Sequence, residues 1–537
     1  MKHLPFSSFM ASARLETATL DQAAGRVGQR RRRWAILLLQ PVALVALLLW
    51  LTGGAVQPVH AQSCPIFPDP QARFGFNVAR DGGRTIDNYN VQPLNGHWYL
   101  DYATQVTPSR PAAMAYAQMI RPNVWARAGT SATVAAALAE NPGMLWIIGN
   151  EPDRDKQDGL TPSEYADFYD ELYHFIKSRD PSSRVAIAGV VQSTPLRRHY
   201  LDLVLAAYQS RYGVALPVDL WTMHAFILPE NYVWGASIPP GMADFADEGM
   251  QYTVDDHDDL AIFQANIVAF RTWMAARGYR DKPLLVTEYG ILLSDLHGFP
   301  YDKVRTFMVG SFDYFLSATD DQIGYAADGN RLVQAWSWFS LNYPPYDPDT
   351  EFGHNGNLLT PDTGLLLELG RDYSTYIAAL DRSQQTTLSV SQFGLDSAVI
   401  ISPTTNSPGT TIPPVSGGPT ATAWPPQVQL SGTLANAGTA AGCNVQIALW
   451  HLAPTGERTR IETRTLPMLA AGATETLTFQ WQPPTLAPGI HRFILRSTAD
   501  NGALGLPTAQ AEVTFPLLVL AQADAHSLHL PLVRLRP

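Results

Sequence analysis

Two glutamates in this 537-residue chain stand at the ends of apolar runs with the same layout. Glu151 closes the run in "MLWIIGNEP", and Glu288 closes the run in "PLLVTEYG", each after a small or polar residue. Taken alone, either glutamate is better explained by a strand that simply ends in solvent. As a pair facing one cavity, however, two carboxylates can act as proton donor and as nucleophile. That is the chemistry that breaks a glycosidic bond.

The two runs can form one site only if the fold brings their ends together. Between about residues 64 and 380, eight apolar runs alternate with six convincing helical patterns. Runs such as "MLWII" and "PLLVT" lack polar alternation, which is typical of parallel strands covered on both faces. This order predicts the α/β class and a (β/α)8 TIM barrel. The first two connections show no clear helix, so a doubly wound open sheet is the structural alternative.

In a barrel, the carboxyl ends of all the strands meet on one face, where catalytic groups lie. The interval from Glu151 to Glu288 has the length of three strand–helix units, which places them on strands four and seven. Other predicted strand ends supply candidates for sugar binding, because polar groups and flat aromatic rings suit that role. These candidates are Asn77, Trp98, Asn150, His224, Trp336 and Trp338.

Several of these candidates also have a structural explanation. His224 could be a buried histidine bonded to backbone, and Trp98, like Trp125, could equally belong to the core. Trp336 and Trp338 are two positions apart, so both face the same side of a strand. We therefore do not expect both to pack on the outer surface, and we expect at least one to form a platform for a sugar ring.

Two motifs resemble clan A of the retaining glycoside hydrolases: Asn-Glu-Pro after the fourth predicted strand and Thr-Glu-Tyr-Gly after the seventh. The resemblance spans roughly residues 73–380. It implies that Glu151 is the acid/base, that Glu288 is the nucleophile and that Asn150 contacts the sugar 2-hydroxyl. It also implies that His224 lines the site, that a tryptophan of strand eight is the sugar platform and that no cofactor is needed. A polysaccharide of β-linked sugars is the substrate class implied.

The chain departs from this family pattern after the sixth strand. The common His-x-Tyr sequence is replaced by His-Ala-Phe at 224–226, and phenylalanine has no hydroxyl that could hydrogen-bond the nucleophile. Tyr289 is too close in sequence to Glu288 to be assumed in that role. The group that orients Glu288 is therefore left open. Asp101 and Arg121 are candidates either for tuning the carboxylates or for surface salt bridges.

The acidic run "DDHDD" at residues 255–259 could suggest a metal site. Acidic residues before a helix are also favoured by the positive end of the helix dipole, and this explanation is preferred. No other spacing in the chain fits a set of metal ligands. Neither a metal nor a cofactor is therefore expected.

The charge balance narrows the possible partners. The chain has 37 basic and 48 acidic residues, which gives a net charge of −11. Nucleic-acid binding needs a basic face that neutralises phosphates, so this class of partner is excluded. A carbohydrate is the expected partner, and nothing in the sequence indicates the oligomeric state.

A linker divides the chain into domains. Residues 402–426 contain 19 Ser, Thr, Pro or Gly among 25 positions, which is typical of a flexible segment. We expect it to separate a catalytic barrel at 62–401, whose end at 381–401 shows no clear pattern, from a second domain at 427–520. That domain alternates with period two, which predicts an all-β, Ig-like sandwich. It resembles the cell-adhesion-related (CARDB-like) modules of secreted bacterial enzymes. Residues 521–537 would form a C-terminal tail.

The N-terminal segment, 1–61, has the layout of an export signal. Arginines at 30–33 precede an apolar run, and Val59 and Ala61 provide the small residues of a cleavage site. The segment is either a removed signal peptide or an uncleaved membrane anchor, and both place the protein outside the cell or at its surface or envelope. Cys64 and Cys443 fall in different predicted domains, so no disulfide is expected.

The sequence thus predicts a secreted glycoside hydrolase that cleaves O-glycosidic bonds of a poly- or oligosaccharide by a retaining, double-displacement mechanism. The alternative belongs to another class: a non-catalytic glycan-binding or surface-adhesion protein built on a barrel scaffold. The adhesion-like second domain and the missing tyrosine hydroxyl support the alternative. The matched glutamates support the enzyme, because a binding protein has no need for them.

Cleavage of the export signal is directly measurable. We expect protein secreted by a bacterial host to begin near Gln62, because the site after Ala61 fits the small-residue rule. Mass spectrometry of the intact secreted protein gives its N-terminus. A full-length product that sediments with membranes would show an anchor instead.

Overall fold

The computed structural model describes Cys64, Phe67 and residues 69–231, 235–395, 399–402, 428–482 and 486–521. Contacts divide the chain into Met1–Gln62 and Ser63–Pro537, and the following account concerns the second unit. The predicted export signal (1–61), all but the first residue of the predicted linker (402–426) and all but the first residue of the predicted tail (521–537) lie outside the described residues.

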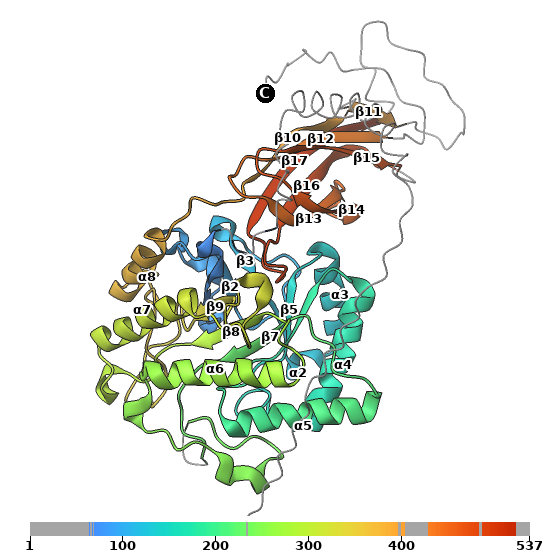
Figure 1. Cartoon of the computed structure of the whole chain (residues 1–537). Coiled ribbons are helices and arrows are strands. Elements are labelled where there is room, and N and C mark those ends of the chain that lie inside the picture. Colours follow the sequence, from blue (N-terminus) through green and yellow to red (C-terminus); the bar gives the residue numbers. More distant parts are fainter. Residues whose placement is uncertain are drawn as a thin grey trace, which may run out of the picture. The chain divides into compact units, whose positions relative to one another are not determined.

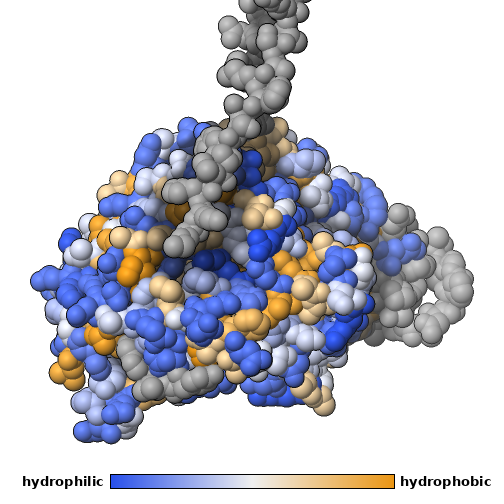
Figure 2. All heavy atoms as spheres, turned by 60° about the horizontal axis from the view of Figure 1, so that its bottom comes forward, coloured by the Kyte–Doolittle hydropathy of each residue, from blue (hydrophilic) through white to orange (hydrophobic). Residues whose placement is uncertain are grey.

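The described part of the chain contains no helix that is both long and apolar enough to cross a membrane. On the face shown in Figure 2, hydrophobic residues are scattered among hydrophilic ones. Such a mixture is the usual surface of a folded protein, in which single exposed apolar residues need no special explanation.

Residues up to about 380 form a parallel, barrel-like α/β domain (Figure 1). One sheet has the order β3-β2-β1-β9-β8-β7 and the other the order β4-β5-β6. Ala117 alone separates β3 from β4, and a parallel bridge joins Ala186 of β6 to Leu220 beside β7. The strands are β1 (Phe74–Asn77), β2 (Trp98–Leu100), β3 (Ala115–Tyr116), β4 (Gln118–Ile120), β5 (Leu145–Ile148), β6 (Arg184–Ile187), β7 (Trp221–His224), β8 (Leu284–Tyr289) and β9 (Ala335–Trp338).

Helices follow the strands from the third position onward, as the sequence predicted. α4 shows why: the Thr161 side chain accepts a hydrogen bond from the Glu164 N–H, and Pro162 occupies the first turn. Its buried face then carries Tyr165 and Tyr169 at helical spacing. The helices are α2 (Pro122–Trp125), α3 (Thr130–Glu140), α4 (Pro162–Arg179), α5 (Pro195–Tyr212), α6 (Leu260–Ala276), α7 (Tyr301–Ser317) and α8 (Glu368–Ala378).

The first two connections contain short 3₁₀ turns in place of helices, in agreement with the absence of a helical pattern there. Further 3₁₀ turns lie in later loops. They are η1 (Pro70–Arg73), η2 (Asp81–Gly83), η3 (Ile86–Asn88), η4 (Gln92–Leu94), η5 (Pro111–Ala113), η6 (Ala243–Glu248), η7 (Val254–Asp256), η8 (Asp295–His297) and η9 (Ala326–Asp328).

The C-terminal part consists of two largely antiparallel sheets whose side chains share one hydrophobic core, with Leu430 and Phe479 from one sheet against Leu449 and Phe493 from the other. The first sheet has the order β10-β12-β15 and the second the order β11-β17-β16-β13-β14, with β11 parallel to β17. Their bounds are β10 (Leu388–Leu395), β11 (Val399–Ser402), β12 (Val428–Asn436), β13 (Gly442–Leu452), β14 (Arg458–Leu469), β15 (Thr474–Trp481), β16 (Gly489–Ala499) and β17 (Ala509–Ala521).

The predicted barrel boundary at residue 401 is too late. β10 and β11 precede the predicted linker, yet β10 pairs with β12 and β11 pairs with β17. The stretch 381–401 lacked a clear pattern because only two positions of β10, Leu388 and Phe393, are buried, and the others are half-buried or exposed without alternation. The second domain therefore takes strands from both sides of the 402–426 segment.

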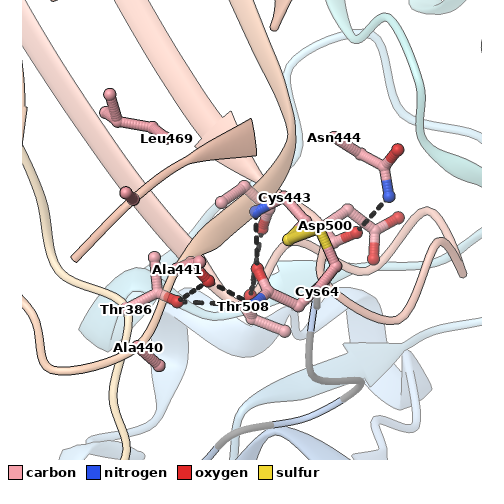
Figure 3. The surroundings of a disulfide bond; sticks show 12 residues. Cys64, Thr386, Ala440, Ala441, Cys443, Asn444, Leu469, Asp500 and Thr508 are labelled. Atoms are coloured by element: carbon pink, nitrogen blue, oxygen red, sulfur yellow. Dashed lines mark hydrogen bonds between the residues drawn. A yellow bond between two sulfur atoms is a disulfide. The ribbon is translucent and has the colours of Figure 1, made fainter. Parts of the chain in front are cut away.

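A disulfide joins Cys64 to Cys443, so the expectation of two unpaired cysteines is wrong (Figure 3). Hydrogen bonds hold the strand ends around it: Thr386 Oγ1 donates to the Ala441 carbonyl and Asn444 Nδ2 donates to the Asp500 carbonyl, each at 2.9 Å. The two cysteines were not expected to meet because they were assigned to different domains. In the structure, the segment before β1 is covalently tied to β13.

The loop between β16 and β17 also enters the core of the barrel-like domain. Leu504 and Leu506 pack in one buried cluster with Trp98, Leu145 and other residues of the barrel strands. The N–H of Leu145 donates to the Gly505 carbonyl at 3.0 Å. The two parts consequently share a hydrophobic cluster, contrary to the expectation of independent domains on a flexible linker.

This shared cluster predicts that the second domain stabilises the first. Leu504 is fully buried, so Leu504→Ala should lower the free energy of unfolding by about 2–5 kcal/mol. Ile490→Ala, in the same domain but half exposed, is the matched control and should have a much smaller effect. Urea unfolding of the full chain with its disulfide intact gives both values. Equal effects of the two substitutions would show that the Leu504 contact contributes nothing.

Candidate active site

Glu151 sits in a strained turn directly after β5. Gly149 has φ +94°, a value that glycine adopts freely, and Glu151 itself has φ +43°, which is uncommon for a residue with a side chain. The turn is fixed by backbone contacts: the Asn150 N–H donates to Asp158 Oδ2 at 2.6 Å and the Glu151 N–H donates to the Gly189 carbonyl at 3.1 Å. Such strained positions concentrate at functional sites.

His224 bridges the two glutamates. Its Nδ1 lies 3.0 Å from Glu151 Oε1, and its Nε2 lies 3.5 Å from Glu288 Oε1. One oxygen of each carboxylate and one ring nitrogen all lie within 4.8 Å of one another, and all three residues are buried. Gly189 leaves room for the ring, since a Cβ there would stand 2.5 Å from His224 Cδ2. The structure thus brings Glu151, His224 and Glu288 together as the sequence predicted.

A cation also contacts this group. Arg154 Nη1 lies 3.3 Å from Glu151 Oε2. The carboxylate oxygens and the ring nitrogen lie close enough together to bind a divalent cation. However, the Arg154 guanidinium already places a positive charge at Glu151, and this charge would repel a metal ion.

The two carboxyl groups have opposite pKa shifts. Burial works to raise the pKa of Glu151, but the hydrogen bond from His224 and the charge of Arg154 outweigh it and lower the pKa to about 2. Burial, together with the nearby Glu151 charge, raises the pKa of Glu288 to about 7, although His224 acts against this rise. The surroundings of the free site therefore favour the ionised form of Glu151 and the protonated form of Glu288. The roles implied by the resemblance, Glu151 as the acid/base and Glu288 as the nucleophile, require the opposite distribution of charge.

Tyr102 is the hydroxyl-bearing neighbour of Glu288 that the sequence analysis left unidentified. It follows β2, and its buried hydroxyl has no partner within hydrogen-bonding distance among the described residues, as is also true of Glu288 Oε1. The two groups nevertheless interact: after burial, the Glu288 charge is the main cause of the raised Tyr102 pKa, and the hydroxyl in turn lowers the pKa of Glu288. Tyr102 ends the run "GHWYLDY", so the strand-end rule that found the other candidates could have found it too.

These groups form the floor of a cleft with a volume of about 250 Å³. Three buried polar atoms in it, Tyr102 Oη, Asn150 Oδ1 and Glu288 Oε1, have no hydrogen-bond partner among the described residues. Buried polar groups are normally paired, so a polar ligand could bind Asn150 Oδ1 and could also pair with Tyr102 and Glu288, which otherwise interact with each other and with His224. The lining residues are Tyr102, Arg121, Asn150, Glu151, Arg154, Gln157, Phe226, Glu288, Leu292, Phe339, Tyr343 and His354.

Trp336 and Trp338 do not reach this cleft, and the expectation that one of them forms a sugar platform is wrong. Trp336 stacks on Phe315 of α7 with ring centroids 4.8 Å apart, and Trp338 meets Phe312 of the same helix at 6.5 Å. Both tryptophans do face the same side, but it is the side covered by helices. The layer between strands and helices is itself buried, so large rings fill it.

Phe339, the residue directly after β9, lines the cleft in place of the two tryptophans. Trp98 is also absent from the cleft, because it lies in the cluster shared with the second domain and its Nε1 donates to the Arg73 carbonyl at 3.2 Å. Trp125 lies outside as well, with its Nε1 donating to Glu171.

Asn77 supports the site from behind, whereas the Asp101 carboxyl pairs with none of the described residues that form the site. Asn77 Nδ2 donates to the carbonyl of Thr287 at 3.0 Å, which fixes β8 one residue before Glu288. Asp101 accepts hydrogen bonds from Tyr116 and Gln105, and neither it nor Asn77 lines the cleft.

Arg121, in contrast, does line the cleft and pairs with Asp158 at 2.7 Å.

The helix explanation of the acidic run 255–259 is confirmed, since Asp259 caps α6 by accepting from the N–H groups of Ala261 and Ile262.

No protein-family model matches the sequence, and no curated protein is similar to it. Among solved structures, the chain is similar to an endo-β-1,3-glucanase of family GH128 from Pseudomonas viridiflava, with a TM-score of 0.37, 15% identity, and coverage of 57% of this chain and 97% of that one.

It is also similar to a GH128 curdlan-specific exo-β-1,3-glucanase from Blastomyces gilchristii solved with glucose, with a TM-score of 0.37, 14% identity, and coverage of 57% and 98%. A CARDB domain from Pyrococcus furiosus gives a TM-score of 0.16 at 15% identity and covers 26% of this chain and 89% of that one. At these values the function proposed below rests on the geometry of the site.

The role assigned to Tyr102 can be tested by titration. Because its hydroxyl lowers the pKa of Glu288, Tyr102→Phe should raise that pKa above about 7 and extend the protonated form to higher pH. Carbon NMR of the labelled Glu288 carboxyl follows the titration. Tyr212→Phe, which removes a surface tyrosine–carboxylate bond, is the control and should leave Glu288 unchanged. An unchanged or lowered pKa in Tyr102→Phe would contradict the role.

Proposed function

We propose that this protein is a glycoside hydrolase whose catalytic pair is Glu151 and Glu288. The observation that carries the proposal is the floor of the cleft: two buried carboxyl groups with oxygens within 4.8 Å, bridged by His224. Around them lie buried polar atoms without partners among the described residues, which the hydroxyl groups of a sugar would satisfy. The strand pairings support a closed (β/α)8 barrel, and the shared core of the C-terminal sheets supports an Ig-like sandwich.

The spacing favours a retaining mechanism. Retaining enzymes hold their carboxyl groups about 5–5.5 Å apart, whereas inverting enzymes need about 6.5–9.5 Å to admit a water molecule between sugar and base. The closest oxygens here lie within 4.8 Å. This short separation is closer to the retaining range than to the inverting range, and it favours direct attack of the second carboxylate on the sugar.

In the first step, Glu151 gives its proton to the glycosidic oxygen while ionised Glu288 attacks the anomeric carbon. The bond to the leaving sugar breaks, and an ester between Glu288 and the retained sugar forms. In the second step, Glu151 takes a proton from water, whose oxygen attacks the anomeric carbon and releases Glu288 as a carboxylate. The site then returns to its starting protonation.

This cycle needs the proton on Glu151, whereas the surroundings in the free site favour a proton on Glu288. His224 contacts both carboxyl groups through its two ring nitrogens and so offers a path between them. A proton from Glu288 can enter at Nε2 while another leaves from Nδ1 to Glu151. Binding of substrate must then shift the balance toward a protonated Glu151.

The Cys64–Cys443 disulfide supports export of the protein, because disulfides persist in oxidising compartments outside the cytosol. The substrate would then be an extracellular glycan, with β-linked polysaccharides as the class that the motif resemblance implies.

Substitution of each glutamate tests the two roles. Glu151→Ala should lose most activity on natural glycans but keep much of its rate on aryl glycosides, whose leaving group needs no proton. Glu288→Ala should lose activity on both, because the covalent intermediate cannot form. Reducing-end and aryl-release assays measure both, with Glu248→Ala on the surface as a control that keeps full activity.

Added azide separates the roles a second time. In Glu151→Ala it should attack the glycosyl-enzyme and give a product of retained configuration, and in Glu288→Ala it should give the inverted product. Full activity in both variants would remove the catalytic assignment. Binding of glycans without any hydrolysis by the native protein would favour the non-catalytic alternative.

A further inference from the structure

Arg154 occupies a central place in the cleft. Its Nη1 lies 3.3 Å from Glu151 Oε2, and its Nη2 donates to the Gly235 carbonyl at 3.1 Å. The side chain remains 24% exposed and lines the cleft. A guanidinium has five N–H groups, and among the described residues Arg154 makes only these two contacts.

No other cationic group among the residues that line the cleft is equally available. Arg121 is paired with the buried Asp158 at 2.7 Å. His354 is neutral near neutral pH, because burial and the charge of Arg154 lower its pKa to about 4. Arg154 is therefore the cation that a ligand in this cleft would meet.

The contact of Arg154 with Glu151 opposes the acid role of Glu151. A positive charge beside a carboxylate stabilises its ionised form, and an ionised Glu151 has no proton to give. An anion that drew the guanidinium away from Glu151 would favour the protonated form of this carboxyl group. Within the cleft, Glu288 is needed as the nucleophile, so this anion has to arrive with the substrate.

We propose that the cleft accepts an anionic sugar, whose carboxylate or sulfate group pairs with Arg154 and draws it away from Glu151. The inference rests on the proposed glycoside hydrolase function and names the substrate class of the same site. The charge of the substrate itself would then prepare Glu151 to act as the acid.

The chemistry of the cleft suits such a group. Guanidinium pairs with carboxylate and other oxyanions through two parallel hydrogen bonds, and these bonds are stronger than neutral ones. Phe226, Leu292 and Phe339 line the same cleft, so part of its wall is apolar. The net charge of −11 does not prevent binding, because salt at physiological ionic strength screens the more distant charges of the protein.

Binding tests the inference without relying on catalysis. The ligands are a tetrasaccharide of β-linked glucuronic acid, its neutral glucose counterpart and a sulfated form of the latter, each titrated calorimetrically into the full chain carrying Glu288→Gln. An anionic tetrasaccharide should bind about 10- to 100-fold more tightly than the neutral one. Adding Arg154→Gln should remove this preference, while Arg179→Gln, an equal loss of charge at an exposed position, should keep it. The carboxylate and sulfate ligands show which anion is preferred.

Kinetic measurements should show that Arg154→Gln changes kcat/KM differently on anionic and on neutral glycans. In Arg154→Gln with native Glu288, kcat/KM on the anionic glycan should fall about 10- to 100-fold. On the neutral glycan it should stay constant or rise, because Glu151 keeps the hydrogen bond from His224 but loses the charge of Arg154, the second group that lowers its pKa. A purely structural role of Arg154 would lower both.

The possible failures are distinguishable. Hydrolysis that prefers neutral glycans, or that Arg154→Gln lowers equally on both, overturns the inference and leaves the glycoside hydrolase function intact. Arg154-dependent binding of anionic glycans without hydrolysis supports the inferred ligand class and overturns the proposed enzyme. Equal binding of all three tetrasaccharides by the chain with Arg154 overturns the inference whatever the activity.

Discussion

The site depends on one electrostatic constraint: two carboxyl groups are buried with oxygens within 4.8 Å of each other. Two negative charges this close repel strongly in a medium of low dielectric constant, so the pair retains a proton that water would remove from either glutamate alone. His224, between the two groups, and Arg154, beside Glu151, decide which carboxyl group holds it. The surrounding structure serves to keep these four side chains in contact.

The fold holds the pair through contacts behind it. Asn77 fixes the β8 backbone before Glu288, and Gly189 leaves space for the His224 ring. The segment after Glu151 is anchored by fully buried Arg197, which pairs with Asp153 and with Glu230, each at 2.8 Å. Loss of one member of such a buried network leaves an uncompensated charge, so this segment has little freedom to move.

The C-terminal domain acts at the other end of the strands. Leu504 and Leu506 meet residues at the start of β5 and β8, whereas Glu151 and Glu288 lie at or beyond the ends of these strands. The domain therefore stabilises the barrel-like domain without entering the cleft. The disulfide from Cys64 to β13 adds a covalent connection between the two parts.

The sequence by itself determined the strand and helix order and the pair Glu151 and Glu288, because hydrophobic periodicity and strand-end position are local properties. Only the tertiary structure decided which way a side chain faces in a doubly covered strand, so Trp336 and Trp338 were misplaced and Phe339 was missed. The tertiary structure also determined the position of Tyr102 beside Glu288, the Cys64–Cys443 bond and the opposite pKa shifts of Glu151 and Glu288. These depend on contacts between residues far apart in sequence, and a pKa in particular is set by every charge and every buried surface around the group.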